Sequence, residues 1–276
     1  MPSLRCLGLP VLAVVLAGCS DSGPPTPPPV TSTEIRNFDF GAAEWFDVTN
    51  SVTVKLVGGM SHPEAQMAPT AFGMVNRVLG PVVYTDVDAD GDEDAAVGLT
   101  AEGGQTFNTA WHIWLWQDGR AVQLRQPIAL ADRCQGEIES VTAKPGAFSV
   151  TAVLRDEGDS CSASGSLPVS YEVSVQDGWP VRIRPEFGPV ETCNPREQTA
   201  QVVPPGELQL RTWPDEKSPA VGEPIEPASV FVDEVYVGRY FRTREDRDKQ
   251  WVLVSAPLGE GRRVCGWARY PDVIPG

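Results

Sequence analysis

The sequence predicts a mainly β protein, and three observations lead to this expectation. Short runs of β-branched and aromatic residues alternate with turn-forming residues over the first two thirds of the chain. Asp-Gly pairs at 118–119 and 177–178 stand between such runs, and Asp-Gly readily adopts the positive φ angles of a two-residue hairpin turn. Only Pro63–Leu79 places apolar residues near helical spacing, and a proline inside it weakens that pattern. We therefore expect an N-terminal β sandwich or meander with at most one short helix, followed by a small β-barrel.

The β-branched runs give the expected strands in order. Val52–Val57 alternates apolar and polar residues, which is typical of a half-buried strand. Pro180 has no N–H to donate, so its strand is expected to begin there or to lie at a sheet edge. The other expected strands are Pro81–Thr85, Ala95–Leu99, Thr109–Gln117, Ala121–Arg125, Ile138–Ala143, Phe148–Leu154, Val169–Gln176 and Val181–Arg184.

Composition and charge exclude one class of partner. The chain has 276 residues, of which 41% are hydrophobic and 21% charged, so it can bury packed cores. Its formal net charge is −15. Because binding to phosphates requires a basic face, this balance argues against a nucleic-acid partner.

The N-terminus has the features of a secretory signal. Arg5 precedes an apolar stretch that is too short for the ~30 Å hydrocarbon core of a membrane. The stretch ends in Leu16-Ala17-Gly18-Cys19, which resembles a bacterial lipobox. The resemblance implies cleavage before Cys19 and attachment of lipid to its sulfur. The alternative is an ordinary signal peptide followed by a chance cysteine.

A proline-rich segment follows the predicted cleavage site. Proline fixes φ near −65°, so the run between Pro24 and Pro29 is expected to form a semi-rigid spacer. The protein would then be extracytoplasmic and held at a membrane by the acyl chains on Cys19. The expected organisation is a signal peptide at 1–18, a lipidated tether at 19–32, a β-rich domain at 33–195, a linker at 196–206 and a second domain at 207–276.

The remaining cysteines suit an oxidising compartment. Four are left besides Cys19 once the signal is removed, and an even number allows three disulfide connectivities. Positions beside turn-like stretches favour Cys134–Cys161, and Cys193–Cys265 would join the linker to the last domain. The other pairings remain open at this point.

One acidic loop is the clearest candidate for chemistry. The segment Asp86–Asp94 reads DVDADGDED, and so many carboxylates repel one another unless a cation collects them. A hard divalent ion with six to eight oxygen ligands suits this role, and Gly91 permits a sharp turn. We expect a structural calcium ion here; the alternative is a solvated acidic turn at a hairpin tip. The candidate ligands are Asp86, Asp88, Asp90, Asp92 and Asp94.

The spacing of this loop departs from an EF-hand. An EF-hand requires Glu at loop position 12, where this chain has Val97 inside a predicted strand. The pattern D-x-D-x-D-G-x-x-D resembles instead the loops of FG-GAP and integrin-like repeats, which lie between two strands. The wider segment is similar to an uncharacterised secreted domain common in bacterial lipoproteins. A single copy does not imply a propeller.

A tryptophan-rich strand has two interpretations. In Trp111–Trp116, both faces of the strand are apolar, which favours a central strand covered on both sides. The alternative is an exposed stripe with Trp114 and Trp116 as candidate ligand-binding residues that stack on sugar rings.

The last quarter of the chain resembles a bacterial SH3-like domain. The motifs occur in the family's order: Leu208, Leu210, Arg211 and Pro214; then Pro-Ala-Val-Gly at 219–222; then the strands Trp251–Val254 and Gly266-Trp267. The resemblance implies a small β-barrel that recognises cell-wall peptides or glycans. Trp213 is a candidate ligand-binding residue, whereas Trp251 and Trp267 are expected in the core.

These features together favour a non-catalytic, lipid-anchored envelope protein. Neither histidine lies in a recognisable motif, and no nucleophile elbow, HExxH motif or P-loop is present. The expected partners are the membrane and either peptidoglycan or another envelope protein. The alternatives are an envelope hydrolase of unrecognised type, or an inhibitor or assembly partner of another envelope protein.

Overall fold

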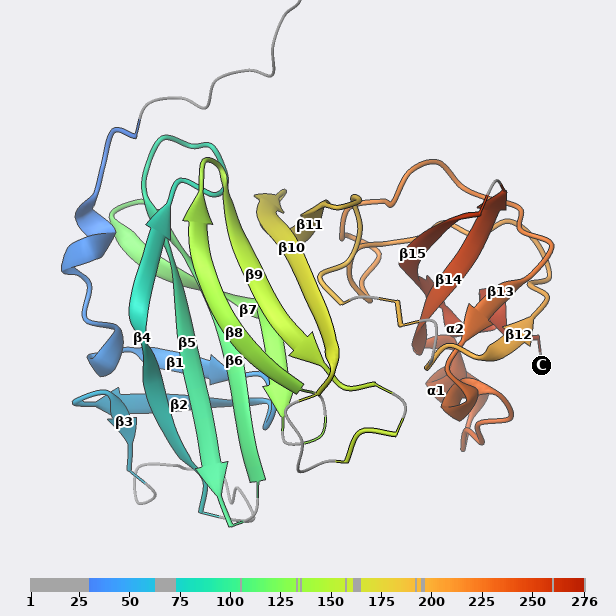
Figure 1. The fold of residues 1–276 in the computed structure, drawn as a ribbon, viewed down its shortest axis with the longest axis horizontal. Helices are drawn as coiled ribbons and strands as arrows, with labels where there is room; N and C mark the ends of the chain where they lie inside the picture. Colours follow the sequence, from blue (N-terminus) through green and yellow to red (C-terminus); the bar gives the residue numbers. More distant parts are fainter. Residues whose placement is uncertain are drawn as a thin grey trace, which may run out of the picture.

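The computed structural model describes residues 30–275, except 63–72, 105, 133, 135, 157, 161–164, 192, 195–196 and 260. Within these residues the protein is mainly β and contains very little helix. Figure 1 shows three sheets, of which the third forms a separate body with the C-terminus. The predicted fold class is confirmed at this level.

The first sheet is a seven-stranded antiparallel meander. Its strands are β1 (Glu44–Asp47), β2 (Val52–Val57), β3 (Met60–Ser61), β4 (Val75–Thr85), β5 (Asp94–Gly103), β6 (Thr106–Gln117) and β7 (Arg120–Asp132), in that spatial order. The sheet curls until it nearly closes into a barrel. The side chain of Gln123 on β7 reaches β1 at the opening, where it accepts from the Phe46 N–H (2.7 Å) and donates to the Phe46 carbonyl (3.1 Å).

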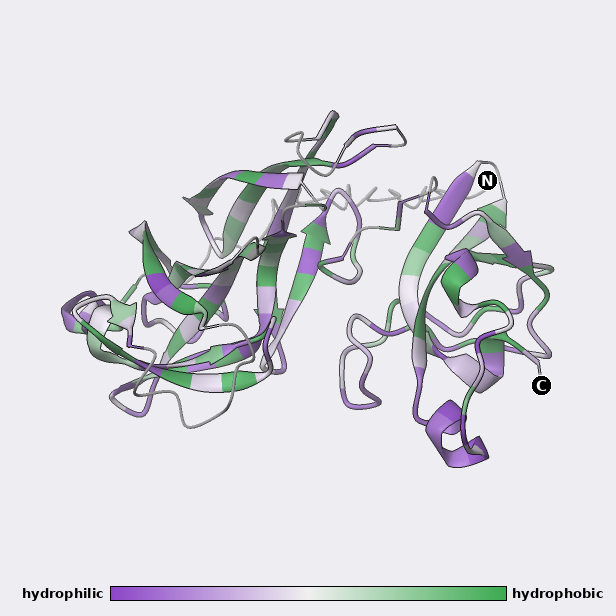
Figure 2. Ribbon diagram, turned by 90° about the horizontal axis from the view of Figure 1, so that it is seen from below, coloured by the Kyte–Doolittle hydropathy of each residue, from purple (hydrophilic) through white to green (hydrophobic). Residues whose placement is uncertain are grey.

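The second sheet packs against the first. Its strands lie in the order β11 (Trp179–Arg184), β10 (Leu167–Gln176), β9 (Ala147–Leu154) and β8 (Gly136–Lys144). Apolar residues alternate with polar ones along the strands (Figure 2), as a sandwich requires. Phe148, Val150 and Val173 from this sheet share one core with Ile113 and Ile128 from the first.

A separate core lies on the other side of the first sheet. Trp114 on β6 packs against Trp45, Phe38 and Phe40, with ring centroids 4.8–5.6 Å apart. The short 3₁₀ helices η1 (Glu34–Asn37) and η2 (Phe40–Ala42) contribute Ile35 and Phe40 to this core. The next residue along β6, Leu115, belongs to the sandwich core instead. The expectation of a strand covered on both faces is therefore confirmed.

Both predicted hairpins are present. Asp118 and Gly119 join β6 to β7 with φ angles of 52° and 72°, and residues 177–178 join β10 to β11 in the same manner. β11 lies at the edge of its sheet, which agrees with the position of Pro180.

The predicted helix at Pro63–Leu79 is wrong in the part that the structure describes. Residues 63–72 lie outside the described residues, and β4 begins at Val75. Val78 pairs with Leu99 of β5. The ladder with β5, together with the β-branched side chains, outweighs the weak helical spacing.

The third sheet has an apolar core of its own. Its strands are β12 (Ala200–Val202), β13 (Val230–Val232), β14 (Trp251–Gly259) and β15 (Arg262–Arg269), in that order. Val230, Val232, Val252 and Val254 are fully buried in it. Short helices lie around the sheet: η4 (Glu234–Tyr236), α1 (Arg244–Asp248) and α2 (Tyr270–Val273). β12 lies within the stretch predicted as a linker, so this sheet begins before residue 207.

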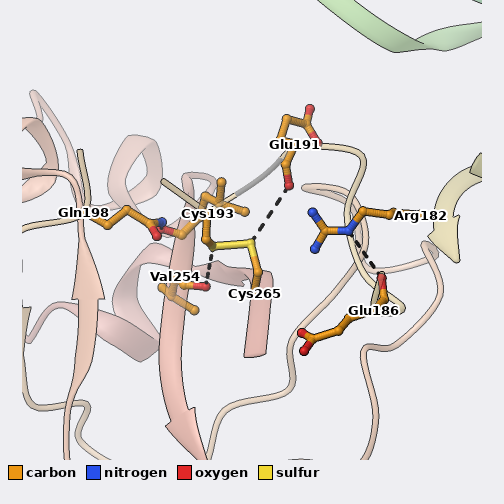
Figure 3. The surroundings of a disulfide bond; sticks show 8 residues. Arg182, Glu186, Glu191, Cys193, Gln198, Val254 and Cys265 are labelled. Atoms are coloured by element: carbon orange, nitrogen blue, oxygen red, sulfur yellow. Dashed lines mark hydrogen bonds between the residues drawn. A yellow bond between two sulfur atoms is a disulfide. The ribbon is translucent and has the colours of Figure 1, made fainter. Parts of the chain in front are cut away.

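A disulfide joins the connecting segment to the third sheet. Cys193 and Cys265 are bonded with their Cα atoms 5.7 Å apart, which confirms one predicted pairing (Figure 3). The bond indicates an extracytoplasmic protein, because disulfides persist in oxidising compartments. Cys161, the predicted partner of Cys134, lies outside the described residues.

The predicted membrane attachment also falls outside the described part of the chain. Residues 1–29, which include the expected signal, Cys19 and the proline run, are not described. Among the described residues, no helix has the length and apolar character needed to cross a bilayer.

Candidate metal centre

The acidic loop connects β4 to β5 and folds back sharply on itself. Ala89 and Gly91 adopt φ angles of 63° and 97°, in the left-handed region that reverses the chain over a few residues. The carboxylate of Asp86 accepts from the Gly91 N–H at 3.1 Å, which closes the turn. Asp94 stands at the first position of β5, directly after the loop.

Three carboxylates converge inside this turn. One oxygen each from Asp86, Asp88 and Asp94 lies within 4.8 Å of the other two. Asp86 is 7% exposed and Asp94 is fully buried, whereas Asp88 is half-buried. Oδ1 of Asp86 is shielded from solvent and makes no hydrogen bond within the described residues. A buried acceptor of this kind requires a partner, and a divalent cation between the carboxylates would supply it.

Backbone amides hold the buried ligand Asp94 in place. Its Oδ2 accepts from the Val87 N–H and its Oδ1 accepts from the Trp116 N–H, both at 2.9 Å. Each carboxylate oxygen keeps a second lone pair after accepting one hydrogen bond. Asp94 is therefore oriented before any ion binds.

The electrostatics of the triad favour an added positive charge. Burial raises the pKa of Asp94 to about 7, and hydrogen bonds from the two backbone amides act against this rise. Burial also raises the pKa of Asp86 and of Asp88, and the negative charge of Asp90 adds to both shifts. A bound cation reverses these shifts because it stabilises the ionised carboxylates.

The structure places the other two predicted ligands differently. Oδ1 of Asp90 accepts from the Asp92 N–H at 2.8 Å, and Oδ1 of Asp92 accepts from the Thr31 hydroxyl at 3.2 Å. Neither carboxylate belongs to the converging group. The loop therefore brings together its first, third and ninth positions, which are Asp86, Asp88 and Asp94. A role for Asp90 and Asp92 as metal ligands stays a prediction.

The loop also fastens distant parts of the first domain. The Val87 carbonyl accepts from the Val175 N–H (3.1 Å) and from the Ser174 hydroxyl (2.9 Å), so the loop connects the first sheet to β10 of the second. On its other side, the Glu93 N–H donates to the Ser32 carbonyl at 2.9 Å. An ion that fixes the loop would stabilise both connections.

The N-terminal contacts of this loop have no signal in the sequence. The Thr31 hydroxyl donates to the Gly91 carbonyl at 2.9 Å, and the Arg36 guanidinium pairs with Glu93 at 2.8 Å. Thr31 lies in the predicted tether, and no local motif marks residues that meet about 60 positions apart in the chain. The signal peptide and tether predictions gave no reason to expect an ordered segment here.

The predicted tryptophan sites have different surroundings. Trp114 is 3% exposed and lies in the aromatic core, and Trp116 is half-buried against the same core. Trp213 is half-buried and lines a cavity beside the disulfide-linked segment. Trp213 therefore borders a space able to hold a ligand.

No family model, curated protein or solved structure gives a significant match to this chain.

Proposed function

We propose that the protein is a non-catalytic binding protein of the cell envelope whose first domain is stabilised by a structural calcium ion. The observation that carries the metal site is the convergence of Asp86, Asp88 and Asp94, together with the unpartnered Oδ1 of Asp86. The disulfide supports an extracytoplasmic address.

The donor set favours calcium over other common ions. All the candidate ligands are oxygens, and calcium accepts six to eight of them in flexible geometry. Zinc prefers nitrogen and sulfur donors, and magnesium retains most of its waters. Backbone carbonyls of the loop and waters at half-buried Asp88 would complete the shell. Extracellular modules bind calcium with Kd values of about 10⁻⁴–10⁻³ M, so a modest affinity suffices in this compartment.

The position of the loop supports a structural role for the ion. The same short segment is hydrogen-bonded to β10 through Val87 and to the N-terminal segment through Glu93. Two of the three carboxylates are buried, so the site is part of the sandwich rather than of an open surface.

Two further parts of the proposal rest on sequence resemblance. Cys19 would carry lipid that holds the protein at a membrane, and the third sheet would belong to an SH3-like module. The presence of a separate apolar core in that module supports its independence. Its ligand would be a cell-wall peptide or glycan, or another envelope protein.

Isothermal titration with calcium tests the metal site. We expect one ion per chain and, for Asp88→Asn, a fall in affinity of about tenfold or more because a ligand charge is lost. Asp88 is the least buried of the triad, so this variant should fold. Glu139→Gln, an exposed carboxylate on β8, is the matched control and should bind as the wild type does. Absence of binding at millimolar calcium, or equal binding by both variants, would contradict the site.

Retention on purified peptidoglycan, measured beside a turnover assay, tests the binding role. Retention without cleavage supports the proposal. Cleavage of the glycan or peptide would replace it with a hydrolase.

A further inference from the structure

A cavity of about 310 Å³ lies between strands of both sheets of the first domain and the segment around the disulfide. Its volume is at the lower end of the range for small-molecule sites. Its walls come from β7, the end of β9, the middle of β10, Val48 after β1, and the segment around Cys193. Trp213 completes the lining from the C-terminal side. None of the acidic-loop residues borders it, so the cavity is independent of the metal centre.

One oxygen of a carboxylate in the cavity lining lacks a hydrogen-bond partner within the described residues. Oε2 of Glu191 is shielded from solvent and makes no hydrogen bond within the described residues. The backbone carbonyl of Glu191 faces the disulfide, 3.9 Å from Sγ of Cys265, and its carboxylate points away from the sulfurs (Figure 3). A buried carboxylate oxygen without a hydrogen-bond partner is costly, so its presence beside a cavity points to a ligand that can donate to this carboxylate.

The charge of Arg182 acts on Glu191, but within the described residues these two side chains form no ion pair. The Nε–H of Arg182 donates to the Glu186 carbonyl at 3.3 Å (Figure 3). Burial raises the pKa of Glu191 to about 7, and the indole of Trp267 and the charge of Arg182 only partly oppose this. The Arg155 guanidinium also borders the cavity and donates to the Asp159 carbonyl.

The rest of the lining suits an apolar body. Pro127, Ala129 and Leu130 of β7 form one wall, and Trp213 is also part of the lining. The Trp213 backbone is fixed by Ser218, whose hydroxyl accepts from its N–H (3.2 Å) and donates to its carbonyl (2.9 Å). Aromatic faces attract ammonium groups as well as alkyl chains.

We infer that this cavity binds a small primary amine with an apolar body. Its ammonium group would donate to the Glu191 carboxylate, and its apolar body would lie against Trp213 and the β7 wall. A carboxylate ligand would instead face an unpaired negative charge. A neutral alcohol could make one hydrogen bond but would leave the carboxylate charge unpaired.

Three ligands of equal length test the chemical class. The disulfide-bonded protein is titrated with hexylammonium, hexanol and hexanoate, followed by calorimetry and by the NMR signal of the Trp213 indole N–H. We expect hexylammonium to bind with a Kd of about 10⁻³ M and to shift this signal, because so small a ligand has limited binding energy. Equal binding of hexanoate, or no binding of hexylammonium, overturns the inference.

Two glutamine variants locate the ammonium group. Glu191→Gln should weaken hexylammonium binding about tenfold, because it replaces a charge-assisted hydrogen bond with a neutral one. Glu197→Gln, an exposed carboxylate at the rim of the same cavity, should change binding less than about threefold. Glu191→Gln removes a charge that is costly to bury, so a melting temperature at or above that of the wild type is expected. Equal binding by the Glu191 variant and the wild type overturns the assignment.

Discussion

Asp94 accepts a hydrogen bond of 2.9 Å from the backbone N–H of Trp116. A residue of the acidic loop thus fixes the tryptophan-rich strand β6, next to the aromatic core around Trp114. Its other oxygen holds the Val87 N–H within the loop itself. Asp94 therefore acts on both the fold and the proposed metal site, and these two roles can be separated.

Replacement of Asp94 should destabilise the protein even without metal. In a chelator, Asp94→Ala leaves the amides of Val87 and Trp116 without an acceptor, and we expect a loss of roughly 3 kcal/mol in the free energy of unfolding. Asp94→Asn keeps one carbonyl oxygen and should lose about half as much. Urea denaturation measures both. If the alanine variant were as stable as the wild type, these hydrogen bonds would not support the loop.

The sequence predicted the features that depend on neighbouring residues. Asp-Gly at 118–119 forms its hairpin because both residues accept positive φ, and β6 is covered on both faces, as the apolar residues on both of its faces indicate. The acidic loop was found because its carboxylates are close in the chain. Its ninth position, Asp94, converges with Asp86 and Asp88 through the fold of the turn.

Features that depend on long-range contacts could not be predicted. Thr31 is hydrogen-bonded to Gly91, and Gln123 to Phe46. These residues lie far apart in the chain, and no local sequence pattern marks either pair. The segment around Val75 had helical spacing, but pairing with β5 decided its structure. The carboxylate of Glu191 was not singled out because only the folded chain encloses it.

Loss of the Cys193–Cys265 disulfide should destabilise the C-terminal part. The bond joins residues 72 positions apart, and the chain-entropy model gives a contribution of roughly 4 kcal/mol for such a loop. The double variant Cys193→Ser, Cys265→Ser should melt at a lower temperature than the wild type under non-reducing conditions. Peptide mapping without reductant should recover the 193–265 pair. Recovery of either cysteine in another pair would contradict the structure.

Acid should destabilise the protein through His112. This residue is fully buried on β6, and burial lowers its pKa to about 4, against opposing effects of the Leu124 carbonyl and of Asp47. The folded state thus binds the proton less readily than the unfolded state. The contribution of neutral His112 to the free energy of unfolding is fully present above pH 6.5 and is lost as the pH falls towards 4. The loss amounts to about 2 kcal/mol at pH 5.

Comparison with His112→Gln isolates this effect from other titrating groups. The difference in unfolding free energy between wild type and variant should become smaller by about 2 kcal/mol between pH 7.5 and pH 5. A difference that is constant with pH would show that His112 does not titrate as described.

The amide of Gln123 should be needed to keep the first sheet nearly closed. Gln123→Ala removes both hydrogen bonds to Phe46 and should cost about 1–2 kcal/mol. Amide hydrogen exchange at Phe46 should become faster, while exchange in the third sheet stays unchanged. Gln123→Glu keeps the acceptor for the Phe46 N–H and should protect that amide better than alanine does. Unchanged exchange at Phe46 in the alanine variant would contradict a role in closure.

Thermal unfolding in calcium and in chelator tests the central claim most directly. At a calcium concentration of about 100 times Kd, the ion should add about 2.7 kcal/mol and raise the melting temperature of the first domain by roughly 5–10 °C. Asp88→Asn should lose most of this rise, whereas Glu139→Gln should retain it. A melting temperature of the wild-type protein that is the same in calcium and in chelator would contradict a structural ion at Asp86, Asp88 and Asp94.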